Sequence, residues 1–367
     1  MKKLTIAKLW LTGLVAVLCF YACKKDLSSN SSINKSPGVN DLTATGSFSY
    51  TQNNLVADTD GFGAARIERA LSNPWGIAAP PGGPLWISAN HRGVSLIFDR
   101  TGHSLRAPVT IPSIAPGQTG APSGVVFNGT SDFKGSKFIF ASEDGIVAAW
   151  WPGNSSATKV VDNSGSNAVY KGIAMASTGG ANYIYLTNFR LARIDVFDKN
   201  FNPVTTMPFV DPGIPAGFAP FNIVKIGLRL FVTYAKQKLP DKMDDQAGPG
   251  NGFVDVFNAD GIFVKRFASH GWLNSPWGLA LSPAGFANVQ QTILIGNFGD
   301  GTINVFDSEG NFKGQLQQGG KPIAIDGLWA IDFLEGNINI GTASDPLFFT
   351  AGPDEESHGL FGTITKN

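Results

Sequence analysis

Polar side chains that could bind a ligand or a metal ion are spread along the chain instead of forming one motif. The sequence has four His and two Cys among 367 residues, and it contains no Gly-x-Ser-x-Gly stretch that would present a serine nucleophile. Scattered His without a neighbouring thiolate do not make a zinc pattern. The abundant candidates are Asn, Asp and Glu, whose oxygens suit hydrogen bonding or a hard cation such as Ca²⁺. They can act together only if the fold brings distant segments to one place.

The first 22 residues have the pattern of a secretory signal. Basic residues near the start precede an apolar stretch, residues 9–22, that is short for a membrane span. Ala22 followed by Cys23 resembles a bacterial lipoprotein cleavage site, at which Cys23 becomes the lipidated first residue; an ordinary cleaved signal peptide is the alternative. Because Cys19 would be removed, the mature chain has no other thiol, which excludes disulfides, a Cys nucleophile and a Cys-ligated metal.

Residues 23–46 are rich in Ser and Asn and predict a flexible tether, so the folded domain is expected over residues 47–367. Removing residues 1–22 takes away three Lys and no acidic residue, which leaves 25 basic and 28 acidic residues and a net charge near −3. Without a basic stripe, nucleic acid is not an expected partner. We expect a monomer of the cell envelope that is held at the membrane through the lipid on Cys23.

Three short signatures recur six times in fixed order, and this repeat is the main evidence for the fold. The first is a small-residue strand opening, and it occurs at residues 73–78, 123–126, 171–174, 220–223, 275–280 and 326–330. An apolar strand and then an alternating strand follow each opening. The marker of the repeat, Gly or its equivalent, stands at positions 76, 124, 172, 222, 278 and 327, so the period is near 50 residues. An all-β, six-bladed β-propeller is predicted.

The chain ends soon after the third strand of the sixth unit, whereas residues 48–56 form a strand without a unit of their own. We therefore expect the N-terminal strand to complete the last blade and close the ring, which leaves no open sheet edge. Trp75, Trp277 and Trp329 belong to strand openings and are expected to pack between blades.

Strand directions alternate within a blade, so the turns between second and third strands share one face with the crossings between blades. This face is called the top face below. Loops held by a rigid scaffold are where binding surfaces concentrate, which predicts a ligand site at the top mouth of the channel. The candidate ligand-binding residues are Asn73, Asn90, His91, Asn188, Arg190, Asn297, Asp300, Asp354 and His358. For any single one, ordinary turn geometry is the alternative explanation.

A metal site is a second interpretation of the same face. Asn222, Asp326 and Glu143 come from different blades and offer hard oxygen ligands, which suit Ca²⁺ if they meet near the axis. Their position at strand openings and turns resembles the gluconolactonase type of six-bladed propeller, and that resemblance implies a divalent ion that polarises a lactone carbonyl. No cofactor other than this possible Ca²⁺ is expected, and the sequence designates no catalytic residue.

Several stretches resemble an uncharacterised bacterial family of exported, NHL-like propellers, some members of which carry PEP-CTERM sorting signals. The matching stretches are residues 55–64, 73–78, 127–133, 219–223, 234–237, 248–257, 296–301 and 350–362. The chain departs from this pattern at residues 90–92 and lacks the sorting tail. The resemblance implies export and a propeller fold, but it brings no activity with it.

Three functional hypotheses follow from the sequence. The leading one is a non-catalytic envelope protein that binds a partner protein or a glycan through the top face. The alternative is a Ca²⁺-dependent lactonase or related hydrolase that uses Asn222, Asp326 and Glu143 or its neighbour Asp144. A purely structural scaffold is the third.

Overall fold

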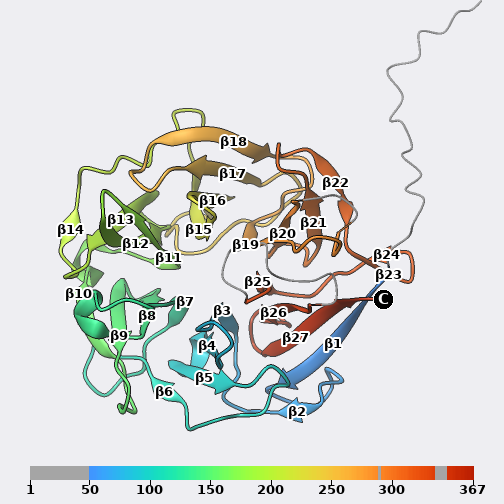
Figure 1. Ribbon diagram of the computed structural model, residues 1–367, viewed down its shortest axis with the longest axis horizontal. Helices are drawn as coiled ribbons and strands as arrows, with labels where there is room; N and C mark the ends of the chain where they lie inside the picture. The colour runs from blue at the N-terminus through green and yellow to red at the C-terminus, as the bar shows by residue number, and fades with distance from the viewer. Residues whose placement is uncertain (1–48, 288–290, 335–344) are drawn as a thin grey trace, which may run out of the picture. The chain divides into compact units, whose positions relative to one another are not determined.

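The computed structural model describes residues 49–287, 291–334 and 345–367, and within them six sheets surround a central axis (Figure 1). The predicted six-bladed propeller is confirmed. The predicted signal peptide over residues 1–22 and the tether over 23–46 lie outside the described residues. Helical structure in the described part is limited to three short 3₁₀ turns, Asn90–Arg92, Phe133–Gly135 and Ser164–Ser166. No helix there is long and apolar enough to cross a membrane.

Blades 1 to 3 follow one another along the chain, each with its strands in sequential spatial order. Blade 1 contains β3 (Pro74–Ala78), β4 (Leu85–Ala89), β5 (Val94–Phe98) and β6 (Val109–Thr110). Blade 2 contains β7 (Pro122–Phe127), β8 (Phe138–Ser142), β9 (Ile146–Trp150) and β10 (Thr158–Asp162). Blade 3 contains β11 (Tyr170–Thr178), β12 (Ala181–Asn188), β13 (Arg193–Asp198) and β14 (Pro203–Val204).

Blades 4 and 5 repeat this arrangement, and blade 6 joins the two ends of the chain. Blade 4 contains β15 (Phe218–Ile226), β16 (Arg229–Lys236), β17 (Gly252–Phe257) and β18 (Phe263–Ser269). Blade 5 contains β19 (Pro276–Leu281), β20 (Ile293–Asn297), β21 (Ile303–Phe306) and β22 (Phe312–Gln315). Blade 6 contains β25 (Leu328–Asp332), β26 (Leu347–Ala351), β27 (Leu360–Lys366), β1 (Tyr50–Ala57) and the short β2 (Arg66–Ile67). A separate small hairpin pairs β23 (Gln317–Gln318) with β24 (Lys321–Pro322).

The N-terminal strand closes the ring, as the sequence predicted. β1 pairs antiparallel with β27 from Tyr50 opposite Lys366 to Ala57 opposite Leu360, with an irregularity between Asn54 and Val56. Figure 1 shows the blue strand β1 beside the red strand β27. The pairing covers the edge of the last blade and holds the two ends of the domain together, which removes an open edge from the ring.

The repeated glycine is needed because neighbouring inner strands approach closely at the axis. A Cβ added to Gly124 would lie 2.9 Å from the backbone nitrogen of Ile173, and one added to Gly172 would lie 2.9 Å from Cα of Asn222. Real Cβ atoms do not tolerate such distances from backbone. The repeat period therefore reports a packing requirement of the ring.

In blade 6 the sequence-derived marker was placed on the wrong residue. Ala330, not Gly327, occupies the position equivalent to Gly172, because the amide of each donates to a threonine hydroxyl on the second strand, Thr350 and Thr187. Gly327 precedes the strand and has a left-handed backbone, with φ 63°. Alanine is small enough for the crowded position, so the local match to Asp-Gly-Leu misplaced the marker by three residues.

The same threonine hydroxyls join adjacent blades. Thr187 Oγ1 donates to the carbonyl of Phe221 in blade 4 at 3.1 Å, and Thr350 Oγ1 donates to the carbonyl of Trp75 in blade 1 at 2.5 Å. Apolar cores fill the spaces between neighbouring blades, as where Trp86 of blade 1 stacks on Phe138 of blade 2 with centroids 4.0 Å apart. These contacts fix the strand openings at the axis and thereby position the residues that follow.

Candidate functional site

The top end of the channel is closed by large side chains that precede the repeat marker in successive blades. Trp75 stacks on Trp329 with ring centroids 3.6 Å apart, and Trp277 meets both rings edge-on. The expectation that these three residues pack between blades is confirmed. They belong to blades 1, 5 and 6, whose inner strands converge at the axis, so their rings pack on one another. Phe221 of blade 4 contacts the same group, which we call the aromatic plug.

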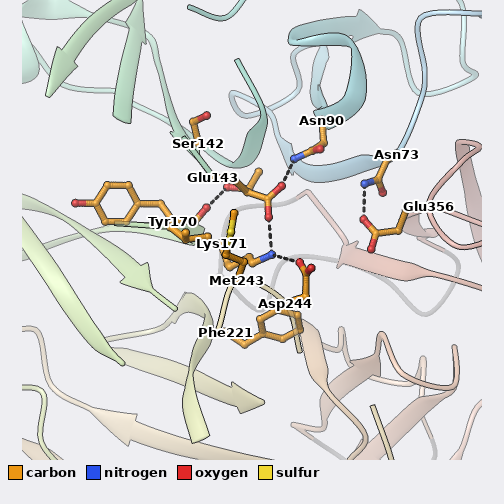
Figure 2. A network of polar contacts seen from close by, with 12 residues as sticks. Asn73, Asn90, Ser142, Glu143, Tyr170, Lys171, Phe221, Met243, Asp244 and Glu356 are labelled. Atoms are coloured by element: carbon orange, nitrogen blue, oxygen red, sulfur yellow. Dashed lines mark hydrogen bonds and ion pairs between the residues drawn. The ribbon is translucent and has the colours of Figure 1, made fainter. Parts of the chain in front are cut away.

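Lys171 occupies the equivalent position in blade 3 and is the charged member of this ring. Its side chain is only 2% exposed, and its ammonium lies 4.9 Å from the centre of the Trp75 ring. Nζ is 2.5 Å from Glu143 Oε1 and 3.3 Å from Asp244 Oδ1 (Figure 2). Burial by itself lowers the pKa of Lys171, but the two carboxylates outweigh it and raise the pKa above its ordinary value. The ammonium is therefore a permanent charge at neutral pH.

Two top-face turns hold the carboxylates against Lys171. Glu143 belongs to the turn that follows β8, where its amide donates to the carbonyl of Ala121 and Asp144 accepts from the amide of the same residue. Asn90, in the equivalent turn of blade 1, donates to Glu143 Oε2 at 2.8 Å. Asp244 comes from the long loop between β16 and β17, and its side chain is 67% exposed. The site therefore combines a fixed interior carboxylate with an accessible one.

Glu356 adds a third carboxyl group from the turn between β26 and β27. Its Oε2 accepts a hydrogen bond of 2.5 Å from Asn73 Nδ2 (Figure 2). The same Nδ2 is 3.3 Å from His91 Nε2. Trp329 of the plug fixes the Asn73 amide by donating to its oxygen at 2.9 Å. Burial raises the pKa of Glu356 to about 7, and the neighbouring Glu143 and Asp244 add to the effect while Lys171 opposes it.

Asp245 is the fourth carboxyl group of this region. Its Oδ2 is buried and has no hydrogen-bond partner in the described part of the chain, and burial raises its pKa. We call Glu143, Asp244, Asp245, Glu356 and Lys171 the top cluster. Lys171 is the one Lys or Arg that forms an ion pair with any of the four carboxyl groups within the described residues. The top cluster therefore has an excess of negative charge.

Four of the sequence-predicted residues belong to this arrangement: Asn73, Asn90 and His91 from the ligand set, and Glu143 from the metal set. The others stabilise loops. Asn188 donates to Asp195, Asn297 donates to Asp300 and to the carbonyl of Trp272, and His358 pairs with Asp58 at 3.1 Å. The backbone amide of Asp354 donates to Asp326, and the carbonyl of Arg190 accepts from Gln237. Turn geometry thus accounts for the recorded contacts of these residues.

The three predicted calcium ligands are held in separate interactions. Asn222 donates to the carbonyl of Trp277 and accepts from the amide of Ile223, and Asp326 accepts from the amide of Asp354. Glu143 is engaged by the Lys171 ammonium, which would repel a second cation. These residues do not fit Ca²⁺ with Glu143 as a ligand. Within the described residues, His, Cys, Asp and Glu form no group of three or more suited to a metal.

Sequence reasoning missed Lys171 as a functional residue, although a signal was present. The residue before the aligned marker is Trp, Ser, Lys, Phe, Trp and Trp in the six blades, so a single charge interrupts a mostly aromatic position. Asp244, Asp245 and Glu356 lie in turns that were assigned to the top face, but nothing in the sequence indicates which turn residues reach the axis.

Comparisons with known proteins give relatives without an assigned activity. No protein-family model matches the chain. Uncharacterized protein R648 of Acanthamoeba polyphaga mimivirus is 35% identical over 321 residues, which is 83% of this chain and 77% of that protein. A second uncharacterized mimivirus protein is 34% identical over 321 residues, again 83% of this chain and 83% of that protein. These relatives are viral, so the bacterial origin, NHL-like repeat type and sorting signals implied by the earlier resemblance stay predictions.

Solved structures confirm the fold. A structure of streptogramin B lyase covers 87% of this chain and 98% of its own, with a TM-score of 0.51 and 13% identity. A protein of unknown function from Bacteroides thetaiotaomicron covers 86% of this chain and 76% of its own, with a TM-score of 0.55 and 10% identity. At such low identity the similarity shows the propeller fold and nothing about substrate or reaction.

Proposed function

This chain belongs to the same family as the two uncharacterized mimivirus proteins, and we propose that it is an exported binding propeller whose top cluster recognises a basic segment of a partner protein. The observation that carries the proposal is the charge balance at the axis. Four carboxyl groups converge there, whereas Lys171 is their one ion-pair partner within the described residues. A cationic partner would supply the missing positive charge.

The carboxyl groups of the top cluster differ in their exposure to solvent, and this difference supports docking of long cationic side chains. Asp244 is largely exposed, Glu356 is half-buried, and Asp245 keeps a buried oxygen without a hydrogen bond. An arginine fork can form two hydrogen bonds with one carboxylate and so suits such a set. A partner that places one guanidinium on Asp244 and another near Glu356 would offset most of the excess negative charge.

A labelled hexa-arginine peptide provides the test. We expect saturable binding to the unmodified protein, measured by fluorescence anisotropy, that weakens as salt is raised from low to physiological concentration. The double variant Asp244→Asn, Glu356→Gln should bind at least about tenfold more weakly, because two of the four carboxyl groups of the top cluster are gone.

The matched control changes the same number of charges elsewhere. Asp260 and Glu309 are exposed and lie in turns between third and fourth strands, away from the top face. Asp260→Asn with Glu309→Gln should leave hexa-arginine binding within about twofold of the unmodified protein, since only the net charge differs. An equal loss in both double variants would show a non-specific charge effect and contradict the proposal.

Attachment to a membrane through a lipid on Cys23 is the second part of the proposal. It rests on the basic and apolar N-terminal pattern and on the Ser- and Asn-rich segment that follows. Mass spectrometry of the N-terminal peptide tests it, with the expected product beginning at Cys23 and carrying acyl chains. A peptide that begins after Cys23, or an unmodified Cys23, would contradict the anchor without bearing on peptide binding.

A Ca²⁺-dependent hydrolase is the alternative, and the unpartnered Asp245 oxygen is the observation in its favour. Calorimetric titration separates the two. We expect no calcium binding by the unmodified protein at millimolar concentration, because the Lys171 ammonium already pairs with Glu143 and Asp244 and would repel a divalent ion. Lys171→Met should allow Ca²⁺ to bind there. Binding to the unmodified protein that is lost in Asp326→Asn would favour the hydrolase.

A further inference from the structure

A cavity of about 610 Å³ occupies the channel on the side of the plug opposite the top cluster. The inner strands of all six blades line it. Turn residues that connect first and second strands, among them Pro81, Thr130 and Pro283, mark one end, and Trp277 of the plug marks the other. The cavity therefore runs from the bottom face to the aromatic plug. Its volume falls within the range of small-molecule sites.

The wall of this cavity is mostly apolar. It is formed by aliphatic and aromatic side chains of the inner strands, such as Ile77, Val125, Met175 and Leu281, and the small residues at the repeat marker keep the strands close. An apolar ligand body would be desolvated here, and its burial contributes favourably at roughly 25 cal/mol for each Å² removed from water.

One carboxyl group interrupts the apolar wall. Asp332 ends β25 and lines the cavity, and its Oδ1 accepts a hydrogen bond of 2.8 Å from the amide of Leu334. Within the described part of the chain, no Lys, Arg or His forms an ion pair with it, and no cation contributes to its electrostatics. Burial raises its pKa to about 6, so at neutral pH it is still an anion in an apolar setting. Such a charge is costly unless a positive group accompanies it.

Lys225 is the other charged residue among the described residues of the wall. It lies on β15 of blade 4, is half-buried, and has no recorded ion pair or side-chain hydrogen bond with the described residues. Asp332 belongs to blade 6, and blade 5 lies between the two. The cavity therefore presents a carboxylate and an ammonium on separate parts of its wall. Both side chains are half-buried, and the carboxylate of Asp332, at the bottom end of β25, is the group with which a cationic ligand would pair.

We propose that this channel cavity is a second binding site, which takes a small apolar molecule bearing one protonated amine that pairs with Asp332. The apolar body fills the space between the inner strands, and the ammonium supplies the positive charge that no described residue places on Asp332. The site is independent of the top cluster, because the aromatic plug separates them and no residue of the top cluster lines the cavity.

The test compares three probes that share one chain length and differ in charge: octylammonium, 1-octanol and octanoate. Calorimetry on the full chain carrying Cys23→Ala, which keeps every described residue and avoids detergent, should give octylammonium at least tenfold tighter binding than the other two. Asp332→Asn should reduce the affinity for octylammonium to that for 1-octanol. Lys225→Gln should leave octylammonium binding unchanged or slightly tighter, because a like charge is removed.

Two further measurements decide the outcome. Ala79→Trp places a bulky ring at the cavity wall and should weaken all three probes, provided that its unfolding midpoint matches the parent. The variant Glu356→Gln in the top cluster should change none of them. If octylammonium binds no tighter than 1-octanol, or if octanoate binds best and Lys225→Gln abolishes it, the proposal is wrong. Hexa-arginine binding at the top face is unaffected by either result.

Discussion

The buried charges at the two ends of the propeller axis differ in the partners that the protein gives them. At the top, Lys171 is 2% exposed and has two carboxylate partners, a ring contact with Trp75 and an anchored position beside the plug. At the bottom, Asp332 has backbone amides as hydrogen-bond donors and no cation among the described residues. A buried charge whose partners all come from the protein contributes to the stability of the fold. A buried charge that lacks an oppositely charged partner instead favours a ligand that supplies it.

The comparison also separates structural from functional polar groups within the top face. Asn188, Asn297 and His358 have partners inside the loops that carry them, and these contacts fix backbone geometry. Glu356 and Asp245 lie near the same axis, and neither forms an ion pair with a described residue, although the Lys171 ammonium opposes the rise in the pKa of each. Position on the binding face is therefore insufficient to identify a site residue, and the missing partner is the more informative property.

The largest expected effect is the difference in the free energy of unfolding between variants of the two lysines. Lys171→Met should lower the free energy of unfolding by about 3–5 kcal/mol, because Glu143 and Asp244 would be left facing each other without their cation. Lys225→Met at the bottom should change it by less than about 0.5 kcal/mol, since this half-buried side chain has no recorded ion pair with the described residues. Denaturant unfolding of both variants measures the difference. Equal losses would mean that the ion pair contributes nothing specific.

The next largest effect is the loss of stability expected when a glycine between the crowded inner strands is replaced. Gly172→Ala should cost about 3 kcal/mol, because its Cβ would lie 2.9 Å from Cα of Asn222 and the strands would have to separate. Gly129→Ala, in a bottom turn, meets its nearest atom at 3.3 Å, on the Phe127 ring, and should cost less than about 1 kcal/mol. Thermal unfolding of the two variants provides the comparison. A Gly172→Ala protein as stable as its parent would contradict the role assigned to the marker.

A smaller difference is expected in the pH dependence of stability contributed by Glu356 at the top of the axis and by Asp332 at the bottom. The folded pKa of Glu356 is about 7 and exceeds its ordinary value of 4.5, so the folded state binds this proton more tightly. Its contribution is complete below about pH 4.5 and is lost as pH rises through 7, by roughly 3 kcal/mol. The pKa of Asp332 is raised from 3.8 to about 6, so its contribution to the stability of the fold is lost between about pH 4 and 6.

Stability curves of Glu356→Gln and Asp332→Asn over pH 4 to 8 separate these contributions from those of other carboxyl groups. The difference from the parent should extend to about pH 7 for the first variant and level off near pH 6 for the second. Parallel curves for all three proteins would show that neither carboxyl group has the pKa assigned to it.

The fold could be predicted from the sequence because its repeat is enforced by packing. Close approaches at the axis require glycine at the marker in four of the six blades, and the unpaired strand at residues 48–56 predicted the closure now seen between β1 and β27. The error in blade 6 arose where Ala330 replaced glycine and a nearby Gly327 offered a false match.

The candidate site was predicted only in part. Topology placed Asn73, Asn90 and Glu143 on one face, which the structure brings together. The contacts of Lys171 with Glu143, of Asn73 with Glu356, and of the three tryptophans with one another join different blades. Such contacts depend on side-chain direction at the axis, and the spacing of residues along one strand does not determine it. The channel cavity is likewise a property of the closed ring.

Side-chain carboxyl shifts of Glu356 and Asp332, followed by NMR during addition of each probe, test the central claim most directly. We predict that hexa-arginine lowers the pKa of Glu356 and leaves that of Asp332 unchanged, whereas octylammonium lowers the pKa of Asp332 and leaves that of Glu356 unchanged. If both probes shift the same carboxyl group, or neither shifts its own, the two ends of the axis are not the two independent cation sites described above.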